Sequence, residues 1–106
     1  MTSRPTSHRV KAAAQDIGDQ LVVWRKILGL TAAQVADRAG IARGTLARIE
    51  HGDPGVSLAG FLSVVQALGQ LDRVVDAVDP YETDLGRARA DQVLPKRVRP
   101  SRALMG

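Results

Sequence analysis

Hydrophobic residues recur at helical spacing over the first two thirds of the chain, and no stretch shows the strict alternation of a surface strand. Over residues 16–28, the side chains of Ile17, Leu21, Trp24 and Leu28 fall on one face, which predicts an amphipathic helix with that face in the core. Four further helices are expected: between Thr31 and Gly40, over 42–51, between Ser57 and Gly69, and over 71–78. The pattern therefore predicts an all-α fold of five helices.

The expected helix ends carry residues that suit them. Thr31 and Ser57 are N-cap types, whose hydroxyl oxygen accepts a hydrogen bond from a free backbone N–H group. A glycine, which adopts the left-handed conformation that stops a helix, follows each of the first four segments: Gly29, Gly40, Gly52 and Gly69. The apolar set expected to face the core between Ser57 and Gly69 is Leu58, Phe61, Leu62, Val64, Val65 and Leu68.

The chain divides into three parts by pattern and charge. Residues 1–14 are polar and basic, without clear periodicity, and are expected to form an N-terminal arm that partly joins the first helix. Residues 15–79 form the predicted helical domain. Residues 80–106 form a C-terminal extension, with a helical turn or two over 83–92 and a flexible basic tail from residue 94.

The stretch from Leu30 to Gly52 predicts two short helices joined by a tight turn. Gln34 stands three residues after Thr31, as a capping box requires, and Gly40 and Ile41 form the turn. The outer face of the second helix then presents small and basic residues: Arg43, Gly44, Ala47, Arg48 and His51. Such a hairpin is typical of proteins that place a helix in the major groove of DNA. The alternative is an ordinary helical hairpin with solvated arginines.

Charge is distributed unevenly, although the net value is only +4. Residues 25–48 hold five basic side chains against one acidic one, and both ends of the chain are basic. Residues 49–84 hold seven acidic side chains against one arginine. This asymmetry favours a molecule with one face for a polyanion and another face turned away from it. Chance segregation in a short chain is the alternative.

Residues 16–78 resemble the Xre/Cro/C1-type helix-turn-helix repressor family. The resemblance is carried by Arg25, Gly29-Leu30-Thr31, Val35-Ala36, Gly40-Ile41, Thr45-Leu46, Ile49-Glu50-His51-Gly52 and Ser57-Leu58. It implies a lambda-repressor-like fold, a homodimer and a palindromic double-stranded DNA operator. Further likeness to HipB-type antitoxins comes from Gly52-Asp53-Pro54-Gly55-Val56-Ser57-Leu58, Ala67-Leu68-Gly69 and Leu94-Pro95-Lys96-Arg97-Val98-Arg99. That likeness implies a toxin–antitoxin operon and a HipA-like kinase toxin as partner.

The residues expected to contact DNA lie at the starts of the two hairpin helices and along the second: Thr31, Ala32, Gln34, Ala42, Arg43, Gly44, Thr45, Ala47, Arg48 and His51. Arg43 is the first long polar residue of the second helix, and it suits either guanine or a phosphate. Gly44 stands where relatives usually carry a longer polar side chain, and Ala32-Ala33 where many carry glutamine. Both departures predict fewer side-chain contacts than relatives make.

Two more groups have structural or partner roles. The family resemblance implies that Arg25 and Glu50 form an ion pair that holds the fold together. Residues 71–78 carry more apolar positions than one short helix needs, which favours a dimer interface formed by Leu71, Val74, Val75, Val78 and Tyr81. A second possible partner surface consists of Val22, Val23 and Ile27.

Composition argues against several other classes of protein. The chain has no cysteine and no histidine spacing typical of a metal site, so we expect no metal and no cofactor. His51, Asp53 and Ser57 lie close in sequence but lack a nucleophile elbow or oxyanion loop, so we expect no enzyme. No apolar run is long enough to span a membrane, which favours a cytoplasmic protein. The alternatives to an antitoxin are a stand-alone repressor and an interaction module without DNA binding.

Overall fold

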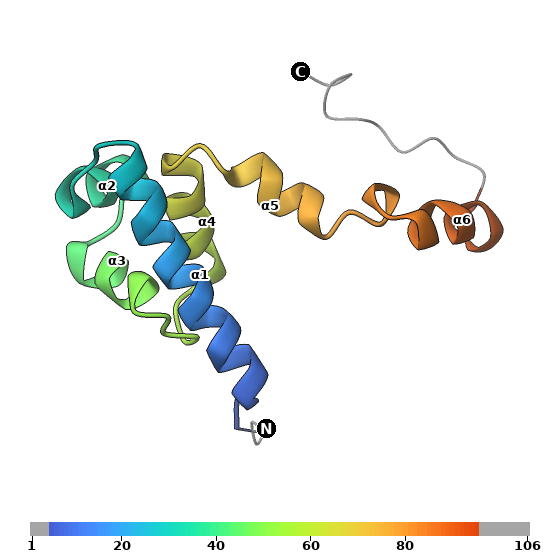
Figure 1. Ribbon diagram of the computed structural model, residues 1–106, viewed down its shortest axis with the longest axis horizontal. Helices are drawn as coiled ribbons and strands as arrows, with labels where there is room; N and C mark the ends of the chain where they lie inside the picture. Colours follow the sequence, from blue (N-terminus) through green and yellow to red (C-terminus); the bar gives the residue numbers. More distant parts are fainter. Residues whose placement is uncertain (1–4, 96–106) are drawn as a thin grey trace. The chain divides into compact units, whose positions relative to one another are not determined.

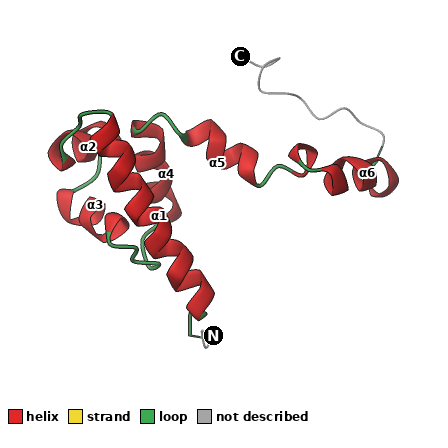
Figure 2. Cartoon of the chain, in the orientation of Figure 1, coloured by secondary structure: helices red, strands yellow, loops and turns green. Residues whose placement is uncertain are grey.

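The computed structural model describes residues 5–95, in which six α-helices and one 3-10 helix are present and strands are absent (Figures 1 and 2). The elements are α1 (His8–Ile27), α2 (Ala32–Ala39), α3 (Arg43–Glu50), α4 (Leu58–Ala67), α5 (Leu71–Ala77), the 3-10 helix η1 (Pro80–Glu82) and α6 (Asp84–Val93). The all-α class is confirmed, but the count of five was one short because α6 is a ten-residue helix. None of the described helices is both long and apolar enough to cross a bilayer.

The chain forms two compact units, Met1–Asp72 and Arg73–Gly106. In the first unit, α2 packs against α4, and α3 packs against α1, α2 and α4. Its buried hydrophobic side chains come from all four helices: Leu21, Val35, Ala36, Leu46, Ile49, Val64, Val65 and Leu68. Because α3 contributes Leu46 and Ile49 to this core, its opposite face is left for other contacts.

Glycines end the first four helices, as the sequence predicts. Their φ angles lie between 67° and 78°, in the left-handed region that side chains with a Cβ rarely adopt. At the end of α3, the Gly52 N–H donates to Ile49 O at 3.0 Å and the Asp53 N–H donates to Arg48 O at 2.9 Å. These two hydrogen bonds satisfy backbone carbonyl groups that would otherwise lack a donor at the helix end. Each helix of the first unit therefore stops at a position fixed by local sequence.

The first helix begins earlier than the sequence pattern indicated. A start near Asp16 was expected, yet α1 begins at His8 because Ser7 acts as its N-cap and accepts from the Val10 N–H at 3.2 Å. Residues 8–13 are all exposed, so these turns project beyond the packed part of the unit (Figure 1). Residues 8–14 of the predicted basic arm are therefore helical, while residues 1–4 and residues 96–106 of the predicted tail lie outside the described residues.

A glycine lets α1 cross the end of α3 at very short range. A Cβ atom added at Gly18 would lie 2.6 Å from Glu50 O and 2.8 Å from Ile49 O. Since both neighbours are backbone atoms, they cannot give way as a flexible side chain would. Gly18 is buried, and with Leu21 it forms the inward face of α1.

Several side chains expected in the core lie at the surface instead. Ile17 is 41% exposed and Leu28 is 45% exposed, because the face of α1 that packs inward centres on Gly18 and Leu21. Leu58 is 70% exposed, since it is the first residue of α4 and stands at the helix end. The core is consequently smaller than the apolar pattern predicted, and it is concentrated on α2, α3 and α4.

The second unit holds a short helical hairpin made of η1 and α6. Thr83 is the N-cap of α6, accepting from the Gly86 N–H at 2.9 Å and donating its hydroxyl to Pro80 O at 2.8 Å. A Cβ atom at Gly86 would collide with Pro80 O, so only glycine allows this close approach. Ala90 is the buried hydrophobic residue of α6.

Candidate nucleic-acid interface

The start of α3 has no side-chain cap. Ala42 occupies the N-cap position with extended backbone angles, φ −69° and ψ 149°, and it has no side chain able to accept a hydrogen bond. The first backbone bond of the helix runs from the Leu46 N–H to Ala42 O at 3.1 Å. The N–H groups of the first turn have no intrahelical acceptor, and they point outward at the positive end of the helix dipole. This end of α3 is suited to an anion or to a base edge.

Arg43 follows as the first residue of α3, and its side chain is exposed. Among the residues that the structure describes, none forms a hydrogen bond or ion pair with its guanidinium group. A guanidinium group presents donors in a rigid planar fork that matches the acceptors of guanine or a phosphate. Arg43 therefore offers unused hydrogen-bonding capacity at the open end of the helix.

The start of α2 differs from that of α3, because side chains at its own N-terminus form hydrogen bonds with free backbone N–H groups there. The Thr31 Oγ1 atom accepts from the Gln34 N–H at 3.1 Å, and Gln34 Oε1 accepts from the Thr31 N–H at 2.9 Å. The predicted capping box is confirmed. Both residues were also expected to contact DNA, and they would do so while holding this reciprocal pair.

A shallow concavity of about 390 Å³ separates the start of α2 from the outer face of α3. Its lining residues are Ala32, Arg43, Gly44, Leu46, Ala47 and Glu50. Four of the residues predicted to contact DNA are thus brought to one surface, together with two that sequence reasoning assigned to the scaffold. The lining is mostly apolar, and Arg43 and Glu50 are the charged residues among those that line it.

Arg48 is engaged within the chain at the other end of α3. Its Nε atom lies 2.7 Å from Asp53 Oδ2, and the Asp53 Oδ1 atom accepts from the Gly55 N–H at 2.8 Å. The hydrogen bond from Arg48, and then that from the Gly55 amide, lower the pKa of Asp53 below its ordinary value. Arg48 was predicted as a DNA contact, and the structure shows a competing partner for it.

Sequence reasoning named Asp53 in the antitoxin-like stretch and in the dismissed catalytic set, but it did not predict the pairing with Arg48. The available signal was the glycine before it, because the left-handed turn at Gly52 carries residue 53 back toward the last turn of α3.

The remaining polar residues near the end of α3 have local structural roles. His51 Nδ1 lies 2.6 Å from Ala47 O, so the ring sits against the helix end. Ser57 Oγ accepts from the Gly60 N–H at 3.0 Å and thereby caps α4. Asp53 is hydrogen-bonded to Arg48. Each of the three residues considered as a catalytic set, His51, Asp53 and Ser57, therefore forms a local hydrogen bond instead of bonding to the other two.

An ion pair joins α1 to the end of α3. The Arg25 Nε atom lies 2.9 Å from Glu50 Oε2, and the two side chains are 17% and 12% exposed. Arg25 also donates to Leu30 O at 3.4 Å, at the entry to the hairpin. Because Glu50 lines the concavity, Arg25 neutralises a carboxylate that would otherwise repel DNA from this surface.

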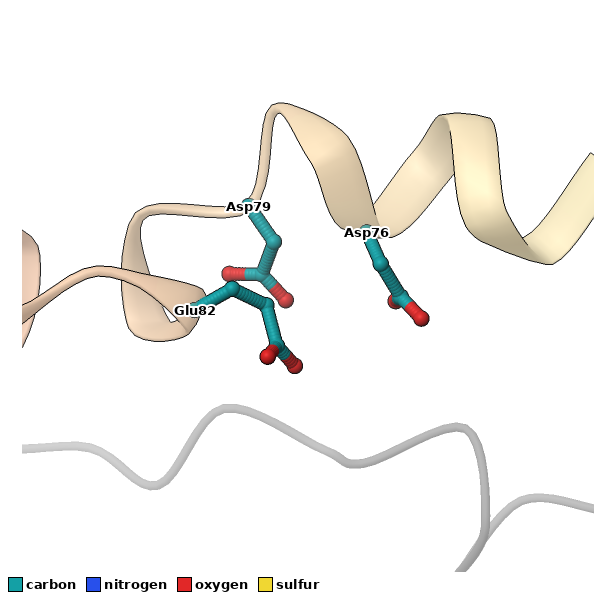
Figure 3. Close-up of side chains that lie close together, drawn as sticks. All are labelled: Asp76, Asp79 and Glu82. Atoms are coloured by element: carbon teal, nitrogen blue, oxygen red, sulfur yellow. The ribbon is translucent and has the colours of Figure 1, made fainter.

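Acidic side chains gather in the second unit, near η1 (Figure 3). Oxygen atoms of Asp76, Asp79 and Glu82 lie within 4.8 Å of one another. Asp79 is the N-cap of η1, and its Oδ1 atom accepts from the Tyr81 N–H at 2.9 Å. This capping role accounts for Asp79 without an ion, and the negative charge makes the cluster unsuited to DNA.

The predicted dimer residues lie on both sides of the division after Asp72. Within α5 no residue is buried. Val75 is 39% exposed and Val78 is 82% exposed, while the other three are half-buried: Leu71, Val74 and Tyr81. The exposed valines leave hydrocarbon available to a partner.

Comparison with known proteins agrees with this geometry. A family model described as a helix-turn-helix domain matches residues 16–89, which is most of the chain. The protein therefore belongs to the helix-turn-helix domain family. No curated protein and no solved structure significantly matches the chain.

Proposed function

We propose that this protein is a sequence-specific, double-stranded DNA-binding transcriptional regulator. The observation that carries the proposal is the open start of α3, where Arg43 is exposed without a partner among the described residues and the first-turn N–H groups lack a side-chain cap. In helix-turn-helix proteins the start of the second hairpin helix enters the major groove. There Arg43 would donate two hydrogen bonds to O6 and N7 of guanine.

The local charge supports the same function. Residues 25–48 hold five basic side chains against one acidic one, a balance that favours a polyanionic partner. The N–H groups at the start of α2 that Thr31 does not cap would contact a phosphate, as helix N-termini do. Arg48 would contribute through its terminal NH2 groups, since Asp53 takes its Nε donor and offsets its charge.

The test is selection from a random double-stranded DNA library, followed by titration of the enriched sequence at several salt concentrations. We expect wild-type protein to enrich one motif and Arg43→Ala to lose that preference. Arg38→Ala removes the same charge from an exposed position outside the concavity and serves as the matched control. Failure to enrich any sequence would favour an interaction module without DNA binding.

We further propose a lambda-repressor-like homodimer that binds a palindromic operator in the cytoplasm, with half-sites about 10–10.5 base pairs apart. The exposed side chains of Val75 in α5 and of Val78 directly after it support an interface through this segment. A Val75→Asp variant should shift a dimer toward monomer in sedimentation experiments. An unchanged dimer would instead favour the surface of α1 that holds Val23 and Ile27, which are 54% and 67% exposed.

The regulatory role we propose is that of a repressor, and within repressors that of a HipB-like antitoxin bound to a HipA-like kinase toxin. The support for this finer role is the sequence resemblance, and the alternative is a stand-alone repressor. Co-purification with a kinase encoded by the neighbouring gene would separate the two. The proposal assigns no catalytic step to the chain, since His51, Asp53 and Ser57 all serve helix ends and turns.

A further inference from the structure

The concavity beside Arg43 is mainly apolar, which is unusual for a surface turned toward a polyanion. Its hydrocarbon comes from Ala32 at the start of α2 and from Leu46 and Ala47 on α3. Arg43 contributes the positively charged group, and Glu50 is neutralised by Arg25 at 2.9 Å. A purely electrostatic contact with a phosphate would not need an apolar lining. The concavity therefore suits a ligand that presents an apolar group next to a group that forms hydrogen bonds.

Gly44 marks the open part of this concavity, and the fold does not require glycine there. Its φ is not positive, and beyond its chain neighbours and the backbone of its own helix no heavy atom lies within 4 Å of a Cβ atom built at this position. Gly44 is the second residue of α3, and glycine forms helices less readily than alanine. The space above Gly44 is therefore left open at the expense of helix stability, which points to an occupant from outside the chain.

We propose that this concavity receives the C5-methyl group of a thymine adjacent to the base that Arg43 contacts. The inference rests on the proposed DNA binding and specifies what the site reads. In the major groove, thymine is the base that presents a methyl group, whereas the other three present only hydrogen-bonding groups there. Alanine methyls and a bare glycine backbone allow the thymine edge to approach closely, and Arg43 fixes the register beside it.

The proposal predicts a preference that separates thymine from uracil. Two random duplex libraries, one made with thymine and one with uracil in its place, present the same hydrogen-bonding groups and differ in the methyl. We expect the thymine library to yield a motif with a guanine next to a thymine. Replacing that one thymine by uracil should weaken binding about fourfold, the effect of losing one buried methyl, and replacing thymines elsewhere should not.

Two variants localise the effect to the concavity. Gly44→Ala adds a methyl in the open space without touching the rest of the protein, so the fold is kept while the thymine-to-uracil ratio should fall toward one. Ala32→Val narrows the opposite wall and should act in the same direction. Ala33→Val is the matched control, because Ala33 is the next residue of α2, is exposed and does not line the concavity.

The outcomes distinguish this inference from the proposed function. Enrichment of a motif with equal affinity for thymine and uracil at every position would overturn the methyl site and leave DNA binding intact. A fourfold difference that Gly44→Ala and Ala33→Val leave equally unchanged would also overturn it. Enrichment of no motif from either library would overturn both proposals together.

Discussion

The two ends of α3 are built in opposite ways. The C-terminal end is fixed by backbone contact with Gly18, by the ion pair of Glu50 with Arg25, and by the glycine turn at Gly52. The N-terminal end has an alanine as its N-cap, an arginine without a partner in the described part of the chain, and Gly44, beside which the concavity along α3 is open. One end of the helix holds the fold together, and the other is free to meet a ligand.

This difference shows how a short helix can be both scaffold and reader. The eight residues of α3 form little more than two turns. A side chain near its start that packed into the core would therefore be unable to contact a ligand. Concentrating the anchoring contacts at one end leaves the other end unobstructed. Substitutions at the two ends should therefore separate stability from DNA binding.

The largest effect is expected at the anchored end, from Gly18→Ala. The added Cβ would lie 2.6 Å from Glu50 O, and overpacking of this kind costs about 1–3 kcal/mol of unfolding free energy. The same change at the open end, Gly44→Ala, meets no atom within 4 Å and should stabilise the protein by about 0.4–1 kcal/mol. Urea denaturation of the two variants measures both. Equal effects would contradict the contrast between the ends.

Removal of the Glu50 carboxylate should be nearly as damaging. In Glu50→Ala the half-buried Arg25 guanidinium loses its carboxylate partner and keeps only its hydrogen bond to Leu30 O, which costs about 1–3 kcal/mol of unfolding free energy. Glu82→Ala is the control, since Glu82 is an exposed acid of the second unit. Arg25→Ala combined with Glu50→Ala should cost less than the two single changes added together, whereas additivity would mean that the pair is not coupled.

At the open end, Arg43→Ala should change recognition rather than stability. We expect a loss of about 1–3 kcal/mol in discrimination between the selected motif and unrelated DNA, because a bidentate contact with guanine is removed. The midpoint of denaturation should stay near that of wild type, as for other exposed substitutions. Fluorescence anisotropy with both DNA sequences tests this. An equal loss on all sequences would make Arg43 a phosphate contact.

The smallest effect is expected at Asp53, and it depends on pH. Because Arg48 lowers the pKa of Asp53, its charged form stabilises the folded state above the ordinary value of 3.8, and this contribution disappears as the pH falls through the lowered pKa. Asp53→Asn lacks it at every pH. The difference in melting temperature between wild type and Asp53→Asn should therefore be present at neutral pH and close upon acidification. A gap that is constant with pH would rule out the pairing.

The parts of the fold that depend on neighbouring residues were predictable from sequence. Thr31 and Gln34, which form a capping box, stand only three residues apart, and each of the four left-handed glycines ends the helix directly before it. The contact of Gly18 with α3 joins residues more than thirty positions apart, so the residues around Gly18 in the sequence could not predict it. Ser7 did offer a local signal for the early start of α1, but the polar residues after it obscured the helix.

The candidate site was predictable only in part, for the same reason. Helical position alone places Arg43 and Gly44 on an outer face. The concavity exists because Ala32 of α2 lies across from Gly44 and Ala47, and that depends on how the two helices pack. The pairing of Arg48 with Asp53 depends on the path of the chain after Gly52.

The uncapped start of α3 also has a spectroscopic consequence. The amide hydrogens of Arg43, Gly44 and Thr45 precede the first intrahelical bond of α3, which Leu46 donates. They should exchange with deuterated solvent much faster than the amide of Leu46 in the same helix. Binding of a ligand that hydrogen-bonds to this end would slow them selectively. The exchange rates of these three amide hydrogens therefore show whether a ligand is bound at the start of α3.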